Sequence, residues 1–498
     1  MLFNSLQFAV FFPVVTILYF LLPHKFRWML LLGASMYFYM VFVPYYILIL
    51  GATIVVDYFA GIWIEEAKSG NRKRAYLVIG LVANIGFLGF FKYFNFLNSN
   101  IAGLADLIGW NYSIENLNII LPIGLSFHTF QAMSYIIEVF RRHQKAERHF
   151  GIYALYVMFY PQLVAGPIER PQNMLHQFHE EHFFDYQRVA DGLKLMTWGL
   201  FKKVVIADRL AAFVNTHYAD PSRASGPLLV VATVCFAFQI FCDFSGYSDI
   251  AIGAAQVMGF KLVVNFKRPY LALSISEFWK RWHMSLSFWF RDYLFLPLAF
   301  ATSRRLPKER YGGIRTDTII YCIATSVTFL LCGLWHGAAW TFVVWGALHG
   351  MYLILERQMQ KIWKIIPQSF RSLPPAWLRR GVSRVIVFTL VGFAWVFFRA
   401  TSLGIAHFIV AKMLSDWSYQ SVAALRSLLL KDSELLITFF FIALMETIHY
   451  FQERGSVRAM LATRPAIIRW VLYTGILACI IVFGKIYTEP TQFIYFQF

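Results

Sequence analysis

The sequence carries little charge for its length. Only 14% of its 498 residues are Asp, Glu, Lys or Arg, whereas about 25% is usual in soluble domains. Hydrophobic residues make up 58% of the chain, and apolar runs of roughly 20 residues recur from end to end. So few charged residues cannot solvate a globule of this size. The composition therefore excludes an ordinary soluble protein and predicts an integral membrane protein.

Markers of several other function classes are also missing. The chain has no P-loop, no G-x-S-x-G elbow and no H-E-x-x-H zinc motif, although His176, His179 and His182 lie close together in the sequence. The cysteines occur singly in apolar segments, where free Cys behaves as a small packing residue; they are Cys235, Cys242, Cys322, Cys332 and Cys479. We therefore expect no bound metal and no permanently bound cofactor.

Basic residues dominate the charge that is present. The formal net charge is +18, but the Lys and Arg residues are concentrated between apolar runs, as the positive-inside rule predicts, so we expect no nucleic-acid partner. Basic loops at 65–75, 141–150, 356–381 and 452–466 alternate with loops at 98–118 and 399–433 that have less positive charge. This alternation predicts that both chain ends face the outside.

Continuous apolar segments predict membrane-spanning helices, because alternating barrel strands would leave a weaker, two-residue pattern. We expect 11 to 12 such helices, at 7–23, 29–45, 47–64, 76–97, 119–140, 190–214, 228–258, 317–335, 337–355, 382–398, 434–451 and 467–485. The first segment lacks a small-residue cleavage site and is predicted to be a retained helix. The fold class is therefore an all-α polytopic membrane protein.

Two segments interrupt this pattern. Residues 151–188 are apolar at first but are broken by Pro161, Gly166, Pro167 and Pro171. Broken backbone at membrane depth is tolerated only within protein or beside a watery cavity, so we expect a re-entrant element there. Residues 260–316 interleave basic and aromatic residues at helical spacing, which predicts amphipathic helices at the cytoplasmic interface.

His336 is the sharpest catalytic candidate. It lies in an apolar segment, GLWHGAAWTFVVWGALHG, where an ionisable residue is a functional-site hypothesis by default. The small residues around it permit close backbone approach and an opening beside the ring. A neutral imidazole could accept the proton of a hydroxyl group. The alternative is a core histidine bonded to a neighbouring carbonyl.

His283 is the second candidate. On a continuous helix His283, Ser287 and Arg291 would share one stripe, which could face an acyl donor. Lys280, Arg281 and Arg291 could bind phosphates of a coenzyme or of a carrier's prosthetic group. The same cations could equally anchor the chain to lipid headgroups.

Two carboxylates lie in the apolar segment FCDFSGYSDIAIG. Helical spacing puts Asp243 on one face with Tyr247, and Ser245 on another face with Asp249. A buried carboxylate needs a partner, so Asp243 either forms a clasp with a Lys or Arg elsewhere or contributes to the site.

With these residues in view, the chain resembles the bacterial alginate O-acetylation branch of the membrane-bound O-acyltransferase superfamily. The resemblance covers nearly the whole length, treated as one integral-membrane acyltransferase domain with a catalytic core at 119–356 and C-terminal helices at 357–498. Its motifs are LPIGLSFHTFQ, FYPQLVAGPIERP, CDFSGYSDIAIG, FWKRWHMSLSFWFRDYLFLPL, GLWHGAAWTFVVWGALHG and FIYFQF.

This resemblance implies helices arranged around a central tunnel, with His336 as the catalytic histidine and His283 as a second functional histidine. The candidate substrate-binding residues are then Lys280, Arg281, Trp282, Ser287, Arg291, Asp243, Ser245, Tyr247, Asp249, Trp335 and Trp340. It further implies a multi-pass protein of the bacterial inner membrane that takes an acyl group from cytoplasmic acetyl-CoA or an acyl carrier thioester. A periplasmic or membrane-anchored acetyltransferase partner would complete O-acetylation of an exported polysaccharide.

Two rival functions are weighed against this one. The teichoic acid D-alanylation branch of the same superfamily would take D-alanyl groups from a carrier protein, but the region after about residue 360 and the segment FIYFQF favour the acetylation branch. A transporter would use Asp243, Asp249 and the histidines to line a path. It would be expected to show inverted repeats, and the sequence has no convincing internal symmetry.

Overall fold

The computed structural model describes residues 1–118, 122–365, 374–485 and 493–496. The start of the predicted helix 119–140, part of the basic loop 356–381 and the last two residues of FIYFQF lie outside the described residues. The chain forms two compact units, the first from residues 1–200, 247–264 and 493–496, and the second from the described residues of 201–246 and 265–491. Each unit is described by itself.

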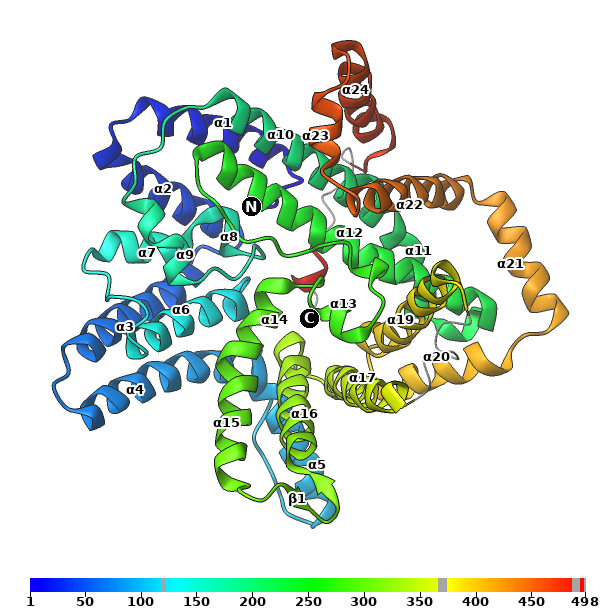
Figure 1. The fold of residues 1–498 in the computed structure, drawn as a ribbon, viewed down its shortest axis with the longest axis horizontal. Helices are drawn as coiled ribbons and strands as arrows, with labels where there is room; N and C mark the ends of the chain where they lie inside the picture. The colour runs from blue at the N-terminus through cyan, green and yellow to red at the C-terminus, as the bar shows by residue number, and fades with distance from the viewer. Residues whose placement is uncertain (119–121, 366–373, 486–492, 497–498) are drawn as a thin grey trace. The chain divides into compact units, whose positions relative to one another are not determined.

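The regular elements of the first unit, within its described residues, are all helices. Its elements are α1 (Leu6–Leu21), α2 (His24–Met40), α3 (Tyr46–Glu66), α4 (Gly70–Leu88), the π-helical η1 (Gly89–Tyr93), α5 (Phe94–Leu107), α6 (Leu125–Phe140), α7 (Phe150–Met158), α8 (Tyr160–Leu163), α9 (Pro171–Met174), η2 (His176–Phe178), α10 (Tyr186–Leu200) and η7 (Ile494–Phe496). Helices α3, α4 and α6 pack on one another, and α2 packs on α7 (Figure 1).

The second unit begins with the π-helical η3 (Phe201–Ala207), which continues α10, and α11 (Asp208–Ala219) and η4 (Pro221–Arg223) follow. Helix α12 (Gly226–Met258) contributes residues to both units. The remaining elements are η5 (Pro269–Leu271), α13 (Ile275–Trp279), α14 (Met284–Phe290), η6 (Arg291–Phe295), α15 (Leu296–Arg305), β1 (Arg310–Tyr311), β2 (Ile314–Arg315), α16 (Thr316–His336), α17 (Trp340–Ile365), α19 (Ala376–Arg399), α20 (Leu403–Ser415), α21 (Tyr419–Lys431), α22 (Ser433–Gln452), α23 (Val457–Ala462) and α24 (Ala466–Phe483).

The two short strands form a hairpin between α15 and α16. Tyr311 pairs with Ile314 across a two-residue turn, and both turn residues, Gly312 and Gly313, have positive φ angles of 56° and 80°. This is the geometry that a tight hairpin turn requires and that glycine adopts without strain.

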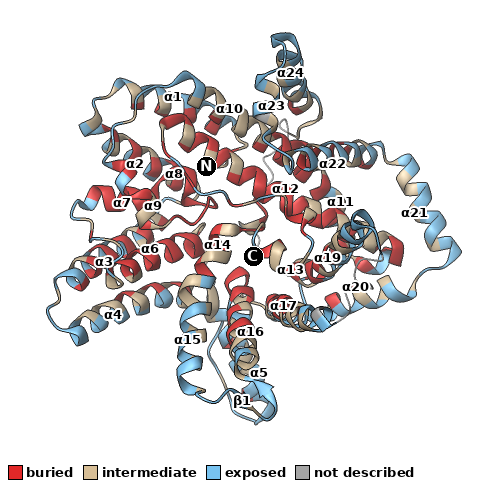
Figure 2. Ribbon diagram, in the orientation of Figure 1, coloured by how far each residue is buried: buried red, intermediate tan, exposed pale blue. Residues whose placement is uncertain are grey.

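The helices confirm an all-α polytopic membrane protein. Seven stretches within the described residues are long and apolar enough to cross a membrane: Tyr46–Glu66, Gly70–Leu107, Gly226–Met258, Thr316–His336, Ala376–Arg399, Ser433–Gln452 and Ala466–Phe483. The other predicted segments also fall on helices, some of them shorter or joined through a π-helical turn. Helix α12 is buried along nearly its whole length, whereas α15 and α21 are largely exposed (Figure 2).

Some predicted segments differ from the observed elements in detail. The predicted loop 98–118 begins inside α5, which ends at Leu107. Residues 399–433, expected as a loop, contain α20 and α21, because Ser402 and Ser418 cap the two helix starts by accepting the N–H groups of Ile405 and Ser421. Residues 151–188 form four short helices, most of whose residues up to Phe178 are buried. The prediction that this segment is too broken to span is confirmed, and its re-entrant placement stays a prediction.

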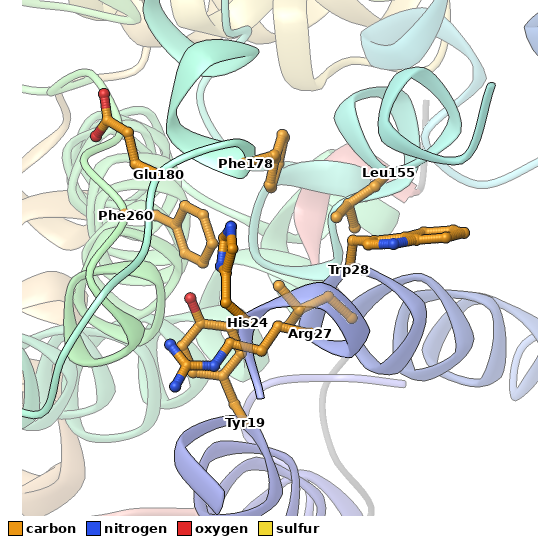
Figure 3. A pocket seen from close by; sticks show the side chains of 9 residues that line it. Tyr19, His24, Arg27, Trp28, Leu155, Phe178, Glu180 and Phe260 are labelled. Atoms are coloured by element: carbon orange, nitrogen blue, oxygen red, sulfur yellow. The ribbon is translucent and has the colours of Figure 1, made fainter. Parts of the chain in front are cut away.

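The first unit also has a small pocket between α2 and the segment that follows α9 (Figure 3). The Arg27 guanidinium lies 4.9 Å from the centre of the Tyr19 ring and donates to the carbonyl oxygen of His182 at 2.6 Å. The pocket is lined by Tyr19, His24, Arg27, Trp28, Leu31, Leu155, Phe178, Glu180 and Phe260. A satisfied arginine therefore ties helix α2 to the chain that leads into α10.

Candidate active site

His336 is the last residue of α16 and is only 4% exposed. Its ring is surrounded by other aromatic rings. Trp335 and Trp345 each lie edge-on at 4.9 Å between ring centres, and Phe398 of α19 lies at 5.3 Å. The imidazole is thus held by aromatic walls from α16, α17 and α19, away from bulk water.

His283 is fully buried and precedes α14 as its N-cap, with a left-handed backbone at φ 43° and ψ 53°. The expected helical stripe of His283, Ser287 and Arg291 would need His283 to be a helical residue, but His283 lies outside α14 (Met284–Phe290), and Arg291 begins the π-helical η6. The stripe from His283 to Arg291 is therefore not formed. A left-handed conformation costs a non-glycine residue about 1–2 kcal/mol, which the surrounding packing must offset.

Asn265 holds the His283 ring in place, and nothing in the sequence had singled it out. Its side-chain oxygen accepts the Ser285 backbone N–H at 3.2 Å and the Ser285 hydroxyl at 2.9 Å, and it lies 3.2 Å from His283 Nδ1. A backbone N–H can only donate, so the atom that it faces is the amide oxygen, and Nδ1 must donate to it as well. The lone pair of the neutral imidazole is then on Nε2.

Burial keeps His283 neutral. Loss of contact with water lowers the pKa of His283 from 6.5 to about 3, because an apolar environment disfavours the charged imidazolium. The ring remains uncharged throughout the physiological pH range and can act as a hydrogen-bonding group there.

The structure brings the two predicted histidines together. The ring centres of His283 and His336 are 6.4 Å apart, and Trp335 lies 6.0 Å from His283. Rings at this separation can both contact one small group. The arrangement provides two imidazoles in a dry aromatic enclosure, a setting in which electrostatic interactions are stronger than in water.

Glycines let α16 and α17, which are neighbours in Figure 1, pack closely near the end of α16. A Cβ on Gly346 would collide with the Phe329 carbonyl oxygen and lie 3.2 Å from the Gly333 nitrogen, and one on Gly337 would overlap the Phe342 ring. The small residues next to His336 therefore allow the backbones to approach, as small residues do at helix interfaces in membranes. The Phe342 ring occupies the space at Gly337.

Asp243 forms the predicted clasp. Lys203 Nζ lies 2.7 Å from its carboxylate and 2.9 Å from the carboxylate of Asp208, and all three side chains are at most 5% exposed. The neighbouring Lys202 donates to Ser245 Oγ at 2.9 Å. Both lysines belong to η3 and were missed, because the partners on α12, Asp243 and Ser245, are about 40 residues away in the sequence.

Helix α12 connects this clasp to the histidine pair. Phe244 follows Asp243, and its ring packs edge-on against His283 at 4.7 Å between centres. Displacement of α12 would therefore disturb the His283 ring directly.

The predicted donor-binding cations differ in accessibility. Lys280 and Arg291 are exposed, although Arg291 pairs with Asp292 at 2.7 Å. Arg281 is held by Glu277 and by Glu453, the latter at 2.6 Å. Phosphate binding by Arg281 would require these carboxylates to move, whereas Lys280 is accessible as it stands.

The remaining predicted residues are spread out. Trp282 is buried and stacks on Phe278 at 5.6 Å between ring centres, Ser287 donates to the Trp282 carbonyl oxygen at 3.2 Å, and Trp340 is 53% exposed where α17 begins. Tyr247 and Asp249 belong to the first unit, where the Tyr247 ring stacks on Phe3 at 4.4 Å. Trp335 lies beside both histidines, at 6.0 Å from His283 and 4.9 Å from His336 between ring centres, and the Ser287 backbone N–H donates to the His283 carbonyl oxygen at 2.9 Å.

The histidines at 176, 179 and 182 bind different partners. His179 Nε2 lies 2.8 Å from Glu147, His182 Nε2 lies 3.0 Å from the Gln177 carbonyl oxygen, and His176 lies 3.9 Å from Glu180.

Comparison with known proteins identifies the family. The model of the membrane-bound O-acyltransferase family matches residues 140–398, just over half of the chain. The chain belongs to this family. It is therefore a membrane protein and an O-acyltransferase enzyme, and the two buried histidines, the clasp and the α16–α17 crossing all lie within or beside the matched residues.

Three relatives illustrate the range of the family. The chain is 35% identical to a peptidoglycan O-acetyltransferase of Helicobacter pylori over 81% of its own length and 78% of that protein. It is 36% identical to a probable alginate O-acetylase of Azotobacter vinelandii over 89% and 84% of the two chains. A teichoic acid D-alanyltransferase of Streptococcus thermophilus is 30% identical over 47% and 56%.

Proposed function

We propose that this acyltransferase passes an acetyl group from a cytoplasmic thioester, either acetyl-CoA or an acyl carrier, across the bacterial inner membrane for O-acetylation of an exported polysaccharide. The observation that carries the proposal is the pairing of His336 and His283 in one aromatic enclosure, 6.4 Å apart. Two relatives support the acyl group and the acceptor class, since their names describe O-acetylation of peptidoglycan and of alginate.

His336 acts as general base in this proposal. The acceptor hydroxyl attacks the thioester carbonyl carbon while its proton moves to the imidazole. The tetrahedral intermediate then collapses, the C–S bond breaks, and the departing sulfur takes the proton back from His336. A covalent route, in which His336 itself carries the acyl group, fits the same enclosure.

Delivery to a polymer outside the membrane requires further components. We propose a central passage between helices that admits the thioester from the cytoplasmic side, and a separate periplasmic or membrane-anchored acetyltransferase that completes transfer to the polysaccharide. The exposed cation Lys280 is the most accessible candidate for the phosphates of the donor.

The test is radiolabelled acetyl transfer in proteoliposomes that contain the purified protein. We expect wild-type protein to transfer label from acetyl-CoA or acetylated carrier to an acceptor, and His336→Ala to assemble normally but to transfer none. His449→Ala is the matched control, because His449 is equally buried at 4% exposure and lies on α22 in the same unit. Transfer at the wild-type rate by His336→Ala would refute the assignment.

Teichoic acid D-alanylation is the second candidate. It is favoured by the match to a D-alanyltransferase, although that match covers only 47% of this chain. Supplying D-alanyl carrier in the same vesicles distinguishes the two, since label from the D-alanyl donor alone would replace the acetylation proposal. The transporter alternative has lost its support, because the family is one of acyltransferases.

A further inference from the structure

Three nitrogen donors are buried around the wall that holds His336. They are Nε1 of Trp345, Nε1 of Trp395 and Nε2 of His349, and each of these side chains is 0% exposed. Across the described residues no hydrogen-bond acceptor lies within reach of any of the three. Indole nitrogen can only donate, so these groups cannot be satisfied by acting as acceptors.

The Nε2 atom of His349 is a hydrogen-bond donor, because Nδ1 of the same ring accepts a hydrogen bond. Its Nδ1 lies 3.3 Å from Trp279 Nε1, which can only donate, so Nδ1 must accept. In a neutral imidazole the proton is then on Nε2. All three nitrogens therefore carry an N–H group that has no hydrogen-bond acceptor among the residues that the structure describes.

Unmatched buried donors are costly and therefore uncommon, since folding removes them from water and gives no bond in return. Here one of the three donors belongs to Trp345, and the other two belong to rings that pack against Trp345. The Trp345 ring lies 4.9 Å from His336, 4.9 Å from His349 and 5.9 Å from Trp395, measured between ring centres. Phe398 contacts Trp345 and Trp395, and its ring centre lies 5.3 Å from that of His336, so it belongs to the same aromatic cluster.

We propose that the indole N–H groups of Trp345 and Trp395 bind the carbonyl oxygen of the acyl thioester and stabilise the oxyanion that forms during transfer. This inference rests on the proposed function, and it names the donors that such a reaction needs. Neither residue was singled out by the sequence, where both read as core aromatics. The Trp345 ring packs edge-on against the ring of the proposed base His336, at 4.9 Å between ring centres.

The chemistry follows from the charge that appears in the reaction. When the acceptor hydroxyl attacks, the carbonyl π electrons move onto oxygen, the hydroxyl proton moves to His336, and a negative charge develops beside the indoles. When the C–S bond breaks, the carbonyl reforms and the electron pair leaves with sulfur. An acyl-histidine route forms an equivalent oxyanion, so the role of the indoles is the same on both routes.

Indole donors suit this enclosure because they add no charge of their own. A pre-oriented N–H in a dry site interacts more strongly with the oxyanion than with the neutral carbonyl, so its loss should lower kcat more than it raises KM. Bulky aromatic rings also keep water from the thioester, which protects it from hydrolysis.

The test removes the N–H groups without changing the shape of the rings. Replacement of Trp345, and separately of Trp395, by 3-benzothienylalanine substitutes sulfur for the indole nitrogen. We expect kcat for acetyl transfer in proteoliposomes to fall by about 10²-fold at Trp345, the size typical of one lost oxyanion donor, with little change in KM. Trp345→Phe should show the same selective loss of kcat.

The matched control places 3-benzothienylalanine at Trp289, which is buried at 6% exposure on α14 in the same unit. That variant should keep wild-type kcat, and thermal melting should show that each variant is folded. Wild-type kcat at both 345 and 395, or a change in KM alone, would overturn the proposal. His336→Ala separates the two claims, because its inactivity beside normal isosteric variants refutes only the indole donors, whereas its full activity refutes the proposed function.

Discussion

Replacement of Lys203 by methionine should be among the most destabilising single changes in the second unit. One ammonium group lies 2.7 Å from Asp243 and 2.9 Å from Asp208, and neither carboxylate side chain is more than 4% exposed. Removing one partner of a buried ion pair costs about 3–5 kcal/mol, because the other charge is left without compensation. Lys203→Met leaves two such carboxylates, so we expect a loss near the upper end, about 5 kcal/mol.

Unfolding in mixed micelles with a rising fraction of sodium dodecyl sulfate, followed by circular dichroism, measures this difference. Lys194→Met is the control, since Lys194 pairs with Asp191 at 3.1 Å but both side chains are about one-third exposed, and such pairs contribute about 0–1 kcal/mol. The triple variant Lys203→Met, Asp208→Asn, Asp243→Asn removes all three charges and should recover most of the stability. The reasoning is refuted if Lys203→Met matches the control, or if the triple variant is as unstable as the single one.

Two further predictions concern the helix crossing and His283. Gly346→Ala should lower the free energy of unfolding by about 1–3 kcal/mol through overpacking, since its Cβ meets the Phe329 carbonyl oxygen; Gly392→Ala, with nothing within 4 Å, is the control in the same assay and should not destabilise. The pKa of His283 falls from 6.5 when unfolded to about 3 when folded, so its contribution to stability is complete above pH 6.5 and is lost as the pH falls from there towards 3. Thermal melting between pH 8 and pH 4 should therefore show a smaller acid-induced decrease for His283→Asn than for the wild type. An equal decrease of the melting temperature in the two proteins would contradict the assignment of this acid sensitivity to His283.

The helices were predictable because their signal is local. Each long apolar run contains nearly everything that a membrane-spanning helix needs, so segments such as 317–335 and 434–451 coincide closely with α16 and α22. The turn before His283 was not predictable, since the 3.6-residue pattern continues unbroken through a backbone that has left the helix. A non-glycine residue with a left-handed backbone, such as His283, cannot be recognised from the residue types around it.

Contacts between side chains that are distant in the sequence could not be predicted either. Asp243 in an apolar segment predicts that a cationic partner exists, but only the fold shows that this partner is Lys203. The sequence did not indicate a role for Asn265 or Trp345, because an amide in a loop and an indole in a helix are common in any protein. Their role becomes visible only when the structure places them beside His283 and His336. The family resemblance implied functional roles for His283 and His336, and the structure places their ring centres 6.4 Å apart.

The backbone at His283 limits which residues this position can accept. Left-handed geometry favours Gly, Asn, Asp and, to a smaller degree, His, and it disfavours Ala and branched residues. An alanine there removes the imidazole and also strains the turn into α14, so its effects combine two causes. Glycine removes the ring and leaves the turn relaxed, and it is the cleaner way to ask what the ring contributes.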